Sequence, residues 1–571
     1  MLPDASSNAP FAFYYLLNFE RALAWLSERY GDVLDAHERA FLTEFSRLPQ
    51  ASRALLVRML MRKGTLFRSS RLSYGEIGCP WQAAAPLVAL GWVDAAPQVS
   101  LDELFALATR PELQQMFAHQ PAVNRKGARK ADLLDALRVT HGEARPYAAW
   151  DAATTDRVFR VIIAPLCERL RLMFFGNLQQ DWSEFVLADL GVFQYESVAF
   201  APSSRAFQQR EDVDVYLALQ ACRDALDTHA EGESVDALLE ALASIQTGNA
   251  WLETRRAKLL FRIGQHCERL QQWDAALGVY ARCAWPGARH RSTRVLERCG
   301  RFDAAMALAE QAAKAPESEE ERQRIARIVP RLQRRLGQPV ARATNPRAIQ
   351  RSVLVLPRPT EPFNVEFAAR DHLGKPQAPV YYVENALINS LFGLLCWEPV
   401  FAAIPGAFFH PFQRGPADLH APDFYMRRAA QFGACLAQLE SGTYRETILR
   451  HLESKAGLQS PFVFWGVLTP DLITLALDCL PAAHLKLWFE RLLLDIRSNR
   501  SGLPDLIRFW PAERRYELIE VKGPGDRLQD NQIRWLDYCV QYGMPVRVLD
   551  VRWTEDTQAG DPLHGDAEAA A

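Results

Sequence analysis

The sequence lacks several features that would point to particular classes of protein. Its 66 basic and 68 acidic residues leave a net charge of −2, so no overall positive field favours nucleic acid. Any such contact must come from local clusters of charge. The ten cysteines include no CxxC pair, which argues against a zinc ribbon or an iron–sulfur cluster. Several lie in apolar helical patterns, as free thiols of a reducing compartment do.

Long apolar runs are missing as well. No stretch of about 18 uncharged apolar residues occurs, so we expect no membrane span. Asp4, Glu20 and Arg21 interrupt the apolar character of the N-terminus, and we therefore expect no signal peptide. These absences predict a soluble protein that is cytoplasmic or associated with the nucleoid.

The chain is long enough for about three or four domains, with 571 residues of which 49% are hydrophobic. Its N-terminal two-thirds have mainly helical patterns, whereas helices alternate with strands after a Pro-, Ala- and Arg-rich linker at 338–347. The predicted fold is therefore multidomain: a largely α region followed by an α/β domain. We predict a helical domain at 1–95, a small module at 96–145, a helical repeat domain at 146–340, an α/β domain at 350–555 and a disordered tail at 556–571.

Apolar residues at helical spacing mark two helices near the N-terminus. Phe19, Leu23 and Leu26 form one stripe, and the other lies between Leu55 and Met61. Basic residues gather around the end of the second stripe, either as a solvated face or as a DNA contact: Arg53, Arg58, Arg62, Lys63, Arg68 and Arg71.

A second basic cluster precedes a short helix in the small module. Ser100 and Glu103 form a capping box that opens the module, and the helix covers 131–137. The amide groups and dipole of a helix entrance favour an anion, so we predict DNA backbone contacts from the cluster. The pattern resembles a SAP-type helix-extension-helix module, although a basic surface turn would have the same composition. The predicted contacts are Arg125, Lys126, Arg129 and Lys130.

A weak internal repeat marks the helical domain. The segment at 268–277 is echoed 29 residues later at 297–306, each with an aromatic residue followed by Asp-Ala-Ala. The pattern resembles tetratricopeptide helical hairpins, whose usual period is about 34. We favour a scaffold role. The alternative is that two basic clusters touch nucleic acid: Arg255, Arg256, Lys258 and Arg262, or Arg289, Arg291 and Arg294.

Two predicted strands near the C-terminus bring charged residues together. One begins after Pro504 with Asp505, and the other ends with Glu520-Val521-Lys522. Side chains two residues apart share a face of a strand, so Glu520 and Lys522 point the same way. The link between the strands is short enough for a hairpin, which brings Asp505 near Glu520.

An acidic residue from an earlier segment completes the predicted cluster. We expect a helix over 381–391 with Leu387 and Leu391 on its buried side. Glu384 lies one turn before Leu387, so we expect it to be drawn toward the apolar side, where a carboxylate needs a partner. On its own this is also the ordinary acidic start of a helix.

The spacing Pro504-Asp505, then Glu520-Val521-Lys522, is the pattern of a PD-(D/E)xK nuclease. Two carboxylates suit a hard cation such as Mg²⁺ or Mn²⁺, which polarises a phosphate and lowers the pKa of bound water. Lys522 can position the water or stabilise developing charge. Glu384 adds a third carboxylate, and the Val521 carbonyl can complete the ligand set. A chance match would be an exposed turn and a charged strand end, but the flanking helices and the buried strand at 545–551 give the nuclease core order.

Further residues carry a resemblance to a known family. The segment 500–505, the run 518–524 and Gln532 with Trp535 resemble a virus-type replication-repair nuclease (VRR-NUC) domain, in which Gln532 matches a position near the active site. The segments at 14–19 and 55–67, the SAP-like module, the repeats and this domain occur in the order of the Fanconi-associated nuclease family, here in a compact, bacterial-looking form.

That resemblance implies a metal-dependent, structure-specific DNA endonuclease of the 5′-flap, phosphodiesterase I type, with 5′-to-3′ exonuclease activity and a role in interstrand-crosslink repair. It also implies a pocket for a 5′-phosphate, for which the basic clusters are candidates. We expect branched or 5′-flap DNA as partner and no membrane. The Cys/His set of the longer members' ubiquitin-binding zinc finger is not seen. Two alternatives are a non-catalytic DNA-binding scaffold on a nuclease fold and an RNA-directed or mobile-element nuclease.

Overall fold

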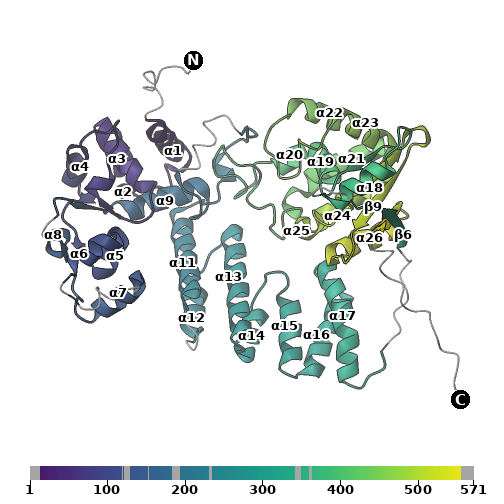
Figure 1. Cartoon of the computed structure of the whole chain (residues 1–571), viewed down its shortest axis with the longest axis horizontal. Coiled ribbons are helices and arrows are strands. Elements are labelled where there is room, and N and C mark those ends of the chain that lie inside the picture. Colours follow the sequence, from purple (N-terminus) through teal and green to yellow (C-terminus); the bar gives the residue numbers. More distant parts are fainter. Residues whose placement is uncertain are drawn as a thin grey trace. The chain divides into compact units, whose positions relative to one another are not determined.

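The structure is a computed structural model that describes residues 13–118, 120, 129–151, 154–182, 193–229, 234–340, 349–358 and 363–554. The chain divides into two compact units (Figure 1). Met1–Phe193 and Phe200–Asp214 form the first, and Gln194–Ala199 and Val215–Ala571 form the second. The five finer domain limits stay a prediction, and the predicted tail from 556 lies outside the described residues.

The first unit begins with amphipathic helices and a small antiparallel sheet of order β1–β5–β2. The apolar residues of both predicted stripes are buried, except that Leu60 and Met61 are half-buried, so both predictions are confirmed. The elements are α1 (Tyr14–Tyr30), α2 (Ala36–Arg47), α3 (Gln50–Leu60), β1 (Leu66–Arg68), η1 (Ser69–Arg71), α4 (Pro80–Ala89), β2 (Val93–Asp94), β5 (Val158–Val161), α9 (Ala164–Phe175) and η3 (Pro202–Ser204).

The SAP-like module has its own small core, with buried Leu104, Leu133 and Trp150. The predicted capping box is present, because Ser100 Oγ accepts a hydrogen bond from the Glu103 amide at 3.2 Å and Glu103 accepts one from the Ser100 amide at 2.9 Å. The elements are β3 (Gln98–Val99), α5 (Leu101–Leu107), α6 (Arg110–Met116), α7 (Lys130–Arg138), β4 (Arg145–Pro146) and α8 (Tyr147–Trp150), with β3 antiparallel to β4.

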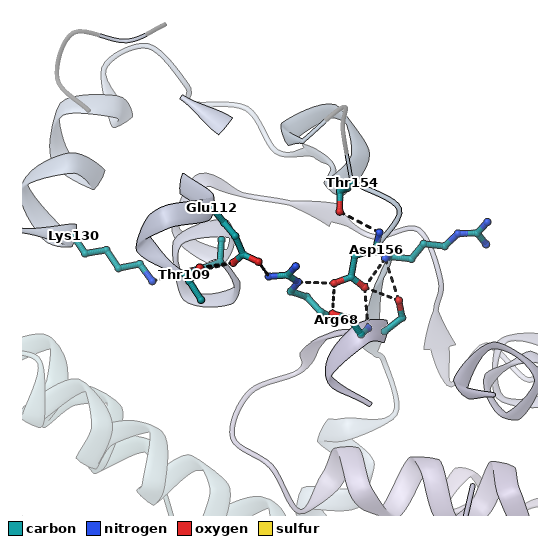
Figure 2. A network of polar contacts seen from close by, with 10 residues as sticks. Arg68, Thr109, Glu112, Lys130, Thr154 and Asp156 are labelled. Atoms are coloured by element: carbon teal, nitrogen blue, oxygen red, sulfur yellow. Dashed lines mark hydrogen bonds and ion pairs between the residues drawn. The ribbon is translucent and has the colours of Figure 1, made fainter. Parts of the chain in front are cut away.

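An ion network ties this module to the sheet of the first unit (Figure 2). Arg68 at the end of β1 pairs with Asp156, which precedes β5, and with Glu112 on α6, each at 2.7 Å. Asp156 also accepts hydrogen bonds from Ser69 Oγ at 2.6 Å and from the Ser70 amide at 2.9 Å. Burial acts to raise the pKa of Asp156, but the bonds from Ser69, Ser70 and Arg68 hold it well below its usual range.

Helical hairpins form the first part of the second unit, where α13 to α17 follow one another side by side (Figure 1). The predicted repeat is confirmed in its placing, because α14 begins at Trp273 and α16 at Phe302. Gly264 permits the close approach of α13 and α14, since a Cβ there would lie 2.5 Å from the Tyr280 ring. The helices are α11 (Arg210–Asp227), α12 (Asp236–Ser244), α13 (Ala250–Arg269), α14 (Trp273–Ala281), α15 (Ala288–Arg298), α16 (Phe302–Lys314) and α17 (Glu319–Arg335).

A five-stranded sheet of order β6–β10–β9–β8–β7 organises the C-terminal domain. β6, β10 and β9 are parallel, whereas β8 runs antiparallel to both β9 and β7. The strands are β6 (Gln350–Leu356), β7 (Val380–Tyr382), β8 (Leu506–Trp510), β9 (Arg515–Lys522) and β10 (Val546–Trp553), with η5 (Pro511–Glu513) in the hairpin. The predicted hairpin and the predicted last strand are therefore confirmed.

The helices of this domain are α18 (Val365–Leu373), α19 (Leu387–Leu395), α20 (Trp397–Val400), η4 (Met426–Arg428), α21 (Ala429–Ser441), α22 (Tyr444–Ser454), α23 (Pro470–Cys479), α24 (Ala482–Leu494), α25 (Ile496–Asn499) and α26 (Asp530–Gln541). The predicted helix–strand–strand–helix–strand order is present as α19, β8, β9, α26 and β10, although the domain also has the strands β6 and β7 and further helices. The helix predicted over 381–391 is wrong in its first part. Residues 380–382 form the edge strand β7, because they pair with β8, and the helix starts only at Leu387.

In the described part of the chain, no single helix is long and apolar enough to cross a membrane. α23 and α24 reach the required length and composition only as a pair, and that pair is bent by 105° at its break.

Candidate active site

The hairpin of β8 and β9 brings Asp505 and Glu520 together. Leu506 pairs with Ile519, so Asp505 and Glu520 are the next opposed positions along the two strands. Asp505 is 5% exposed, and its Oδ2 accepts a hydrogen bond from the Val521 amide at 2.8 Å. The strand pairing therefore confirms that Asp505 lies beside the Glu520-Val521-Lys522 segment.

Glu520 is a buried carboxylate with little to satisfy it. Its side chain is 0% exposed, and apart from the Lys522 ammonium neither carboxylate oxygen has a hydrogen-bond donor in the residues that the structure describes. The Lys522 ammonium forms an ion pair with it, with Nζ 2.8 Å from Oε1, since the two side chains share a face of β9. Buried carboxylate oxygens rarely lack donors, so the unused lone pairs of Glu520 are available to bind a further cation.

The pKa of both buried carboxyl groups is raised. Burial is the largest cause for both Asp505 and Glu520, and the negative charge of Asp505 raises the pKa of Glu520 further. The Val521 amide and the Lys522 charge act in the opposite direction on Asp505. One ammonium cannot neutralise two carboxylates, so the pair has the chemistry of a divalent-cation site.

Glu384 does not lie on a helix, and its predicted burial is wrong. It lies in the turn between β7 and α19 and is exposed, because Tyr382 is still in the sheet and the helix begins three residues later. Tyr382 Oη donates a hydrogen bond to its Oε2, and Asn385 Nδ2 donates to Oε1 at 3.2 Å. Its charge nevertheless contributes to the raised pKa of both Asp505 and Glu520, so it faces their cluster from outside.

Glu366, near the start of α18, is a further acidic residue near the site that was not predicted from the sequence. Asn364 caps this helix by accepting a hydrogen bond from the Glu366 amide at 2.9 Å. Val365 lies against Gly523, and the Phe367 ring contacts Tyr382, so the first turn of α18 sits over the site. The charge of Glu366 raises the pKa of Asp505. The capping pattern Asn364-Val365-Glu366 was the one signal in the sequence.

The described residues contain no ready-made group of three or more His, Cys, Asp or Glu side chains around a metal position. The close carboxylates are the pair Asp505 and Glu520, with Glu384 and Glu366 at the periphery. Gln532 lies on the first turn of α26, where its Oε1 accepts a hydrogen bond from the Gln529 amide at 2.9 Å. The adjacent Asn531 packs against Gly502, whose Cβ would lie 2.8 Å from it, so α26 abuts the segment before Asp505.

The predicted DNA contacts of the SAP-like module are only partly described. Arg125 and Lys126 lie outside the described residues. Arg129 is exposed, and α7 begins at Lys130, as the predicted helix entrance requires. Lys130 Nζ donates a hydrogen bond to the Ala108 carbonyl at 2.8 Å and so points back into the module (Figure 2).

Three of the six basic residues near α3 have acidic partners within the first unit. Arg58 pairs with Glu76 at 2.7 Å, Arg53 pairs with Glu20, and Arg68 belongs to the network around Asp156. In the repeats, Arg289 pairs with buried Glu321, and Arg291 with buried Glu268. Acidic partners distant in sequence explain these clusters as well as a DNA surface does.

One basic cluster of the repeats instead forms a pocket between α11 and α13, with a volume of about 300 Å³. Arg223, Arg255, Lys258 and Arg262 line this pocket, and we call it the basic pocket. Burial lowers the pKa of Lys258 most, and the charges of Arg255, Arg497, Arg223 and Arg262 lower it further. Asp227 pairs with Arg262 at 2.6 Å, and the other cations held this close together favour a bound anion.

The sheet order and the buried hairpin cluster define the class of protein. It is a nuclease domain of the PD-(D/E)xK type that follows a largely helical region in the sequence. Family models match in the predicted order, "FAN1, HTH domain" over residues 13–94, "Fanconi anemia-associated nuclease SAP domain" over 98–150 and "VRR-NUC domain" over 439–553. Glu384 precedes the last of these matches. A Fanconi-associated nuclease 1 homolog from Pseudomonas aeruginosa is 56% identical, over 97% of this chain and 98% of its own length. The chain belongs to the Fanconi-associated nuclease family and is a nuclease, and that class of nuclease implies a divalent metal.

More distant relatives are similar over nearly the whole chain. A homolog from Arabidopsis thaliana is 24% identical over 94% of this chain and 67% of its own length, and the human protein is 23% identical over 94% and 62%. A solved structure named "Crystal structure of paFAN1 bound to 2nt 5'flap DNA with gap" is similar with a TM-score of 0.86. That chain is 55% identical, and the match covers 97% of this chain and 99% of that one.

Proposed function

We propose that this chain is a Mg²⁺- or Mn²⁺-dependent, structure-specific DNA endonuclease with 5′-to-3′ exonuclease activity. Its substrates are 5′-flap and branched DNA, its reaction is phosphodiester hydrolysis, and its role is in interstrand-crosslink repair in the cytoplasm, at the nucleoid. The observation that carries this proposal is the buried cluster of Asp505, Glu520 and Lys522, in which the Lys522 ammonium is the one donor to Glu520 among the described residues. The relative solved on 5′-flap DNA supports the substrate class.

We infer that Asp505, Glu520, Glu384 and the Val521 carbonyl hold the cation. When bound there, a divalent cation polarises the phosphate and lowers the pKa of water. Lys522 already lies 2.8 Å from Glu520, so its ammonium is placed to hold the attacking water or to stabilise charge that develops on the phosphate. The side-chain amide of Gln532, on α26, contributes a further polar contact to the metal-bound water or to the phosphate.

We assign the basic pocket to the terminal 5′-phosphate of the DNA. Guanidinium groups suit the oxygens of a phosphate, and the lysine adds a compact charge. Burial and then the charges of the neighbouring arginines lower the pKa of Lys258, and the second of these causes supports an anionic occupant. Arg256 does not line this pocket, so it is not one of the proposed phosphate contacts.

DNA backbone contacts from Arg125, Lys126, Arg129 and Lys130 remain part of the proposal. Phosphate contacts of this kind carry no sequence information, so selection of the substrate rests on DNA shape. Of the two described residues, Arg129 is the better candidate, because Lys130 is bonded to the Ala108 carbonyl.

The test is cleavage of a labelled 5′-flap duplex in Mg²⁺ or Mn²⁺ by the native chain and by Asp505→Ala. We expect cutting near the flap junction and a loss of about 100-fold or more in the variant, because it lacks a metal ligand. DNA binding, followed by fluorescence anisotropy, should be unchanged. Glu517→Ala is the matched control, because Glu517 lies on the same sheet, pairs with Arg547 at 3.2 Å and is partly exposed.

The alternative is a non-catalytic DNA-binding scaffold on the same fold. It predicts binding without cutting in either metal, and that result would replace our proposal. Cutting of a matched RNA flap in preference to the DNA flap would instead favour an RNA-directed nuclease. The presence of Asp505, Glu520 and Lys522 in one buried cluster argues for catalysis, since a scaffold does not need two buried carboxylates that repel each other.

A further inference from the structure

Asn385 adopts an unusual backbone conformation beside the candidate active site. Its φ of +51° lies in the left-handed region, which residues other than glycine rarely enter and which asparagine tolerates best. It directly follows Glu384 and precedes α19 by one residue. A residue keeps such a conformation only when the surrounding contacts stabilise it.

Both ends of the Asn385 side-chain amide are bonded. Its Oδ1 accepts a hydrogen bond from the Leu503 amide at 3.1 Å, and its Nδ2 donates to Glu384 Oε1 at 3.2 Å. The orientation of the amide follows from the chemistry, because a backbone N–H can only donate and a carboxylate only accepts. One side chain therefore joins Glu384 to the segment two residues before Asp505.

The backbone reinforces this connection. The Asn385 carbonyl accepts a hydrogen bond from Asn389 Nδ2 at 2.6 Å, and the same Nδ2 donates to the Arg500 carbonyl at 2.9 Å. The Val383 amide donates to the Asp505 carbonyl at 2.8 Å. The turn that carries Glu384 and the segment that carries Asp505 are thus bonded on both sides of Asn385.

We propose that Asn385 is a positioning residue of the metal site, which holds the Glu384 carboxylate in register with Asp505 so that both reach one divalent cation. This proposal rests on the proposed function. Glu384 is exposed and lies in a turn, so without donors its long side chain would sample many rotamers. Asn385 binds one of its oxygens and Tyr382 the other, which fixes the direction in which the carboxylate points.

The experiment measures Mn²⁺ affinity by electron paramagnetic resonance titration of Asn385→Gly, alongside its melting temperature. Glycine accepts the backbone conformation and removes only the side-chain bonds. We expect a loss of about 10-fold in Mn²⁺ affinity, the lower range for residues that orient metal ligands, with only a small fall in melting temperature from the lost bond to the Leu503 amide. Flap cleavage should recover at saturating Mn²⁺. The matched control is Arg514→Gly, which also introduces glycine at a position with positive φ. Arg514 is exposed, has φ of +48° and lies in the β8–β9 hairpin.

A double-mutant cycle with Glu384→Gln tests whether Asn385 acts through Glu384. We expect the double variant to lose less affinity than the product of the two single losses. Fully multiplicative losses, an unchanged affinity in Asn385→Gly, or an equal loss in Arg514→Gly would each overturn the proposal. If the native chain binds Mn²⁺ and cuts DNA while Asn385→Gly behaves like it, only this inference fails. If the native chain does neither, the proposed function fails with it.

Discussion

At the scale of single residues, the main feature of this nuclease is a buried pair of carboxylates that its own fold does not neutralise. Asp505 has one amide donor, and Glu520 has only the Lys522 ammonium beside it. Such a pair costs stability in the absence of a cation, since burial and mutual repulsion disfavour the charged forms. Stability given up in this way is recovered when a ligand binds the folded state.

A change of Glu520 to glutamine should therefore stabilise the protein when divalent cations are removed. The pKa of both carboxyl groups is raised in the folded state, so the protonated groups stabilise the fold below the ordinary pKa values of Asp and Glu, and this stability is lost as the pH rises from there through the raised pKa of each group. In EDTA at pH 8 we expect Glu520→Gln to be more stable by about 1–3 kcal/mol, with a flatter dependence on pH. Thermal unfolding measures this.

Addition of Mn²⁺ should then raise the melting temperature of the native chain and leave that of Glu520→Gln nearly unchanged. Glu517→Gln is the control, because Glu517 lies on the same strand but pairs with Arg547 at 3.2 Å and is partly exposed. A Glu520→Gln variant that is less stable than the native chain in EDTA would show that the pair is not strained.

At the scale of elements, Asp156 holds together parts of the first unit that come from distant segments. It binds Arg68, which is 88 residues away, along with Ser69 and Ser70, and Arg68 in turn reaches Glu112 on α6 (Figure 2). The Arg68 and Asp156 side chains are only 11% and 8% exposed, so this pair differs from an ordinary surface ion pair.

We expect Asp156→Ala to destabilise the first unit by about 3 kcal/mol, because it leaves the Arg68 charge buried with Glu112 alone. Hydrogen exchange should rise in β1 and α6, and thermal unfolding gives the size of the loss. Asp102→Ala is the matched control, since Asp102 and its partner Arg138 are both more than half exposed and such pairs contribute about 0–1 kcal/mol. Equal effects of the two changes would contradict a special role for Asp156.

At the scale of the whole molecule, the near-neutral net charge means that DNA must be held by local sites. The basic pocket and the carboxylate cluster belong to the same compact unit but to different parts of it, the helical repeats and the sheet. One of them attracts anions and the other cations. A 5′-phosphate in the first would set where along the strand the second cuts.

Removal of the Lys258 charge should therefore distinguish DNA ends. We expect Lys258→Ala to cut a 5′-phosphorylated flap about 10-fold more slowly, as the loss of one charged hydrogen bond of about 1.5 kcal/mol implies. Cutting of the 5′-hydroxyl flap should be unchanged. The control is Lys314→Ala, an exposed lysine of α16. An equal loss on both flaps would show that Lys258 contacts DNA without reading the phosphate.

The sequence by itself determined the features that depend on short-range pattern. Alternation along a strand placed Glu520 and Lys522 on one face, a short link made the hairpin, and the capping box opened α5 at Ser100. The motif at 268–277, echoed 29 residues later, located the repeats. These patterns are local, so one chain was enough to predict them, and the order of motifs pointed to the family.

Tertiary structure decided what depends on partners far away in the chain. Pairing with β8 turned 380–382 into a strand and left Glu384 in a turn, because the hydrogen bonds of an edge strand outweighed the helical pattern of its sequence. Arg68 and Lys258 each belong to a basic cluster in the sequence. In the structure Asp156 pairs with Arg68, whereas Lys258 lies among arginines. The function of a charge cluster depends on neighbours that are distant in the sequence. The local sequence pattern does not show which residues these neighbours are.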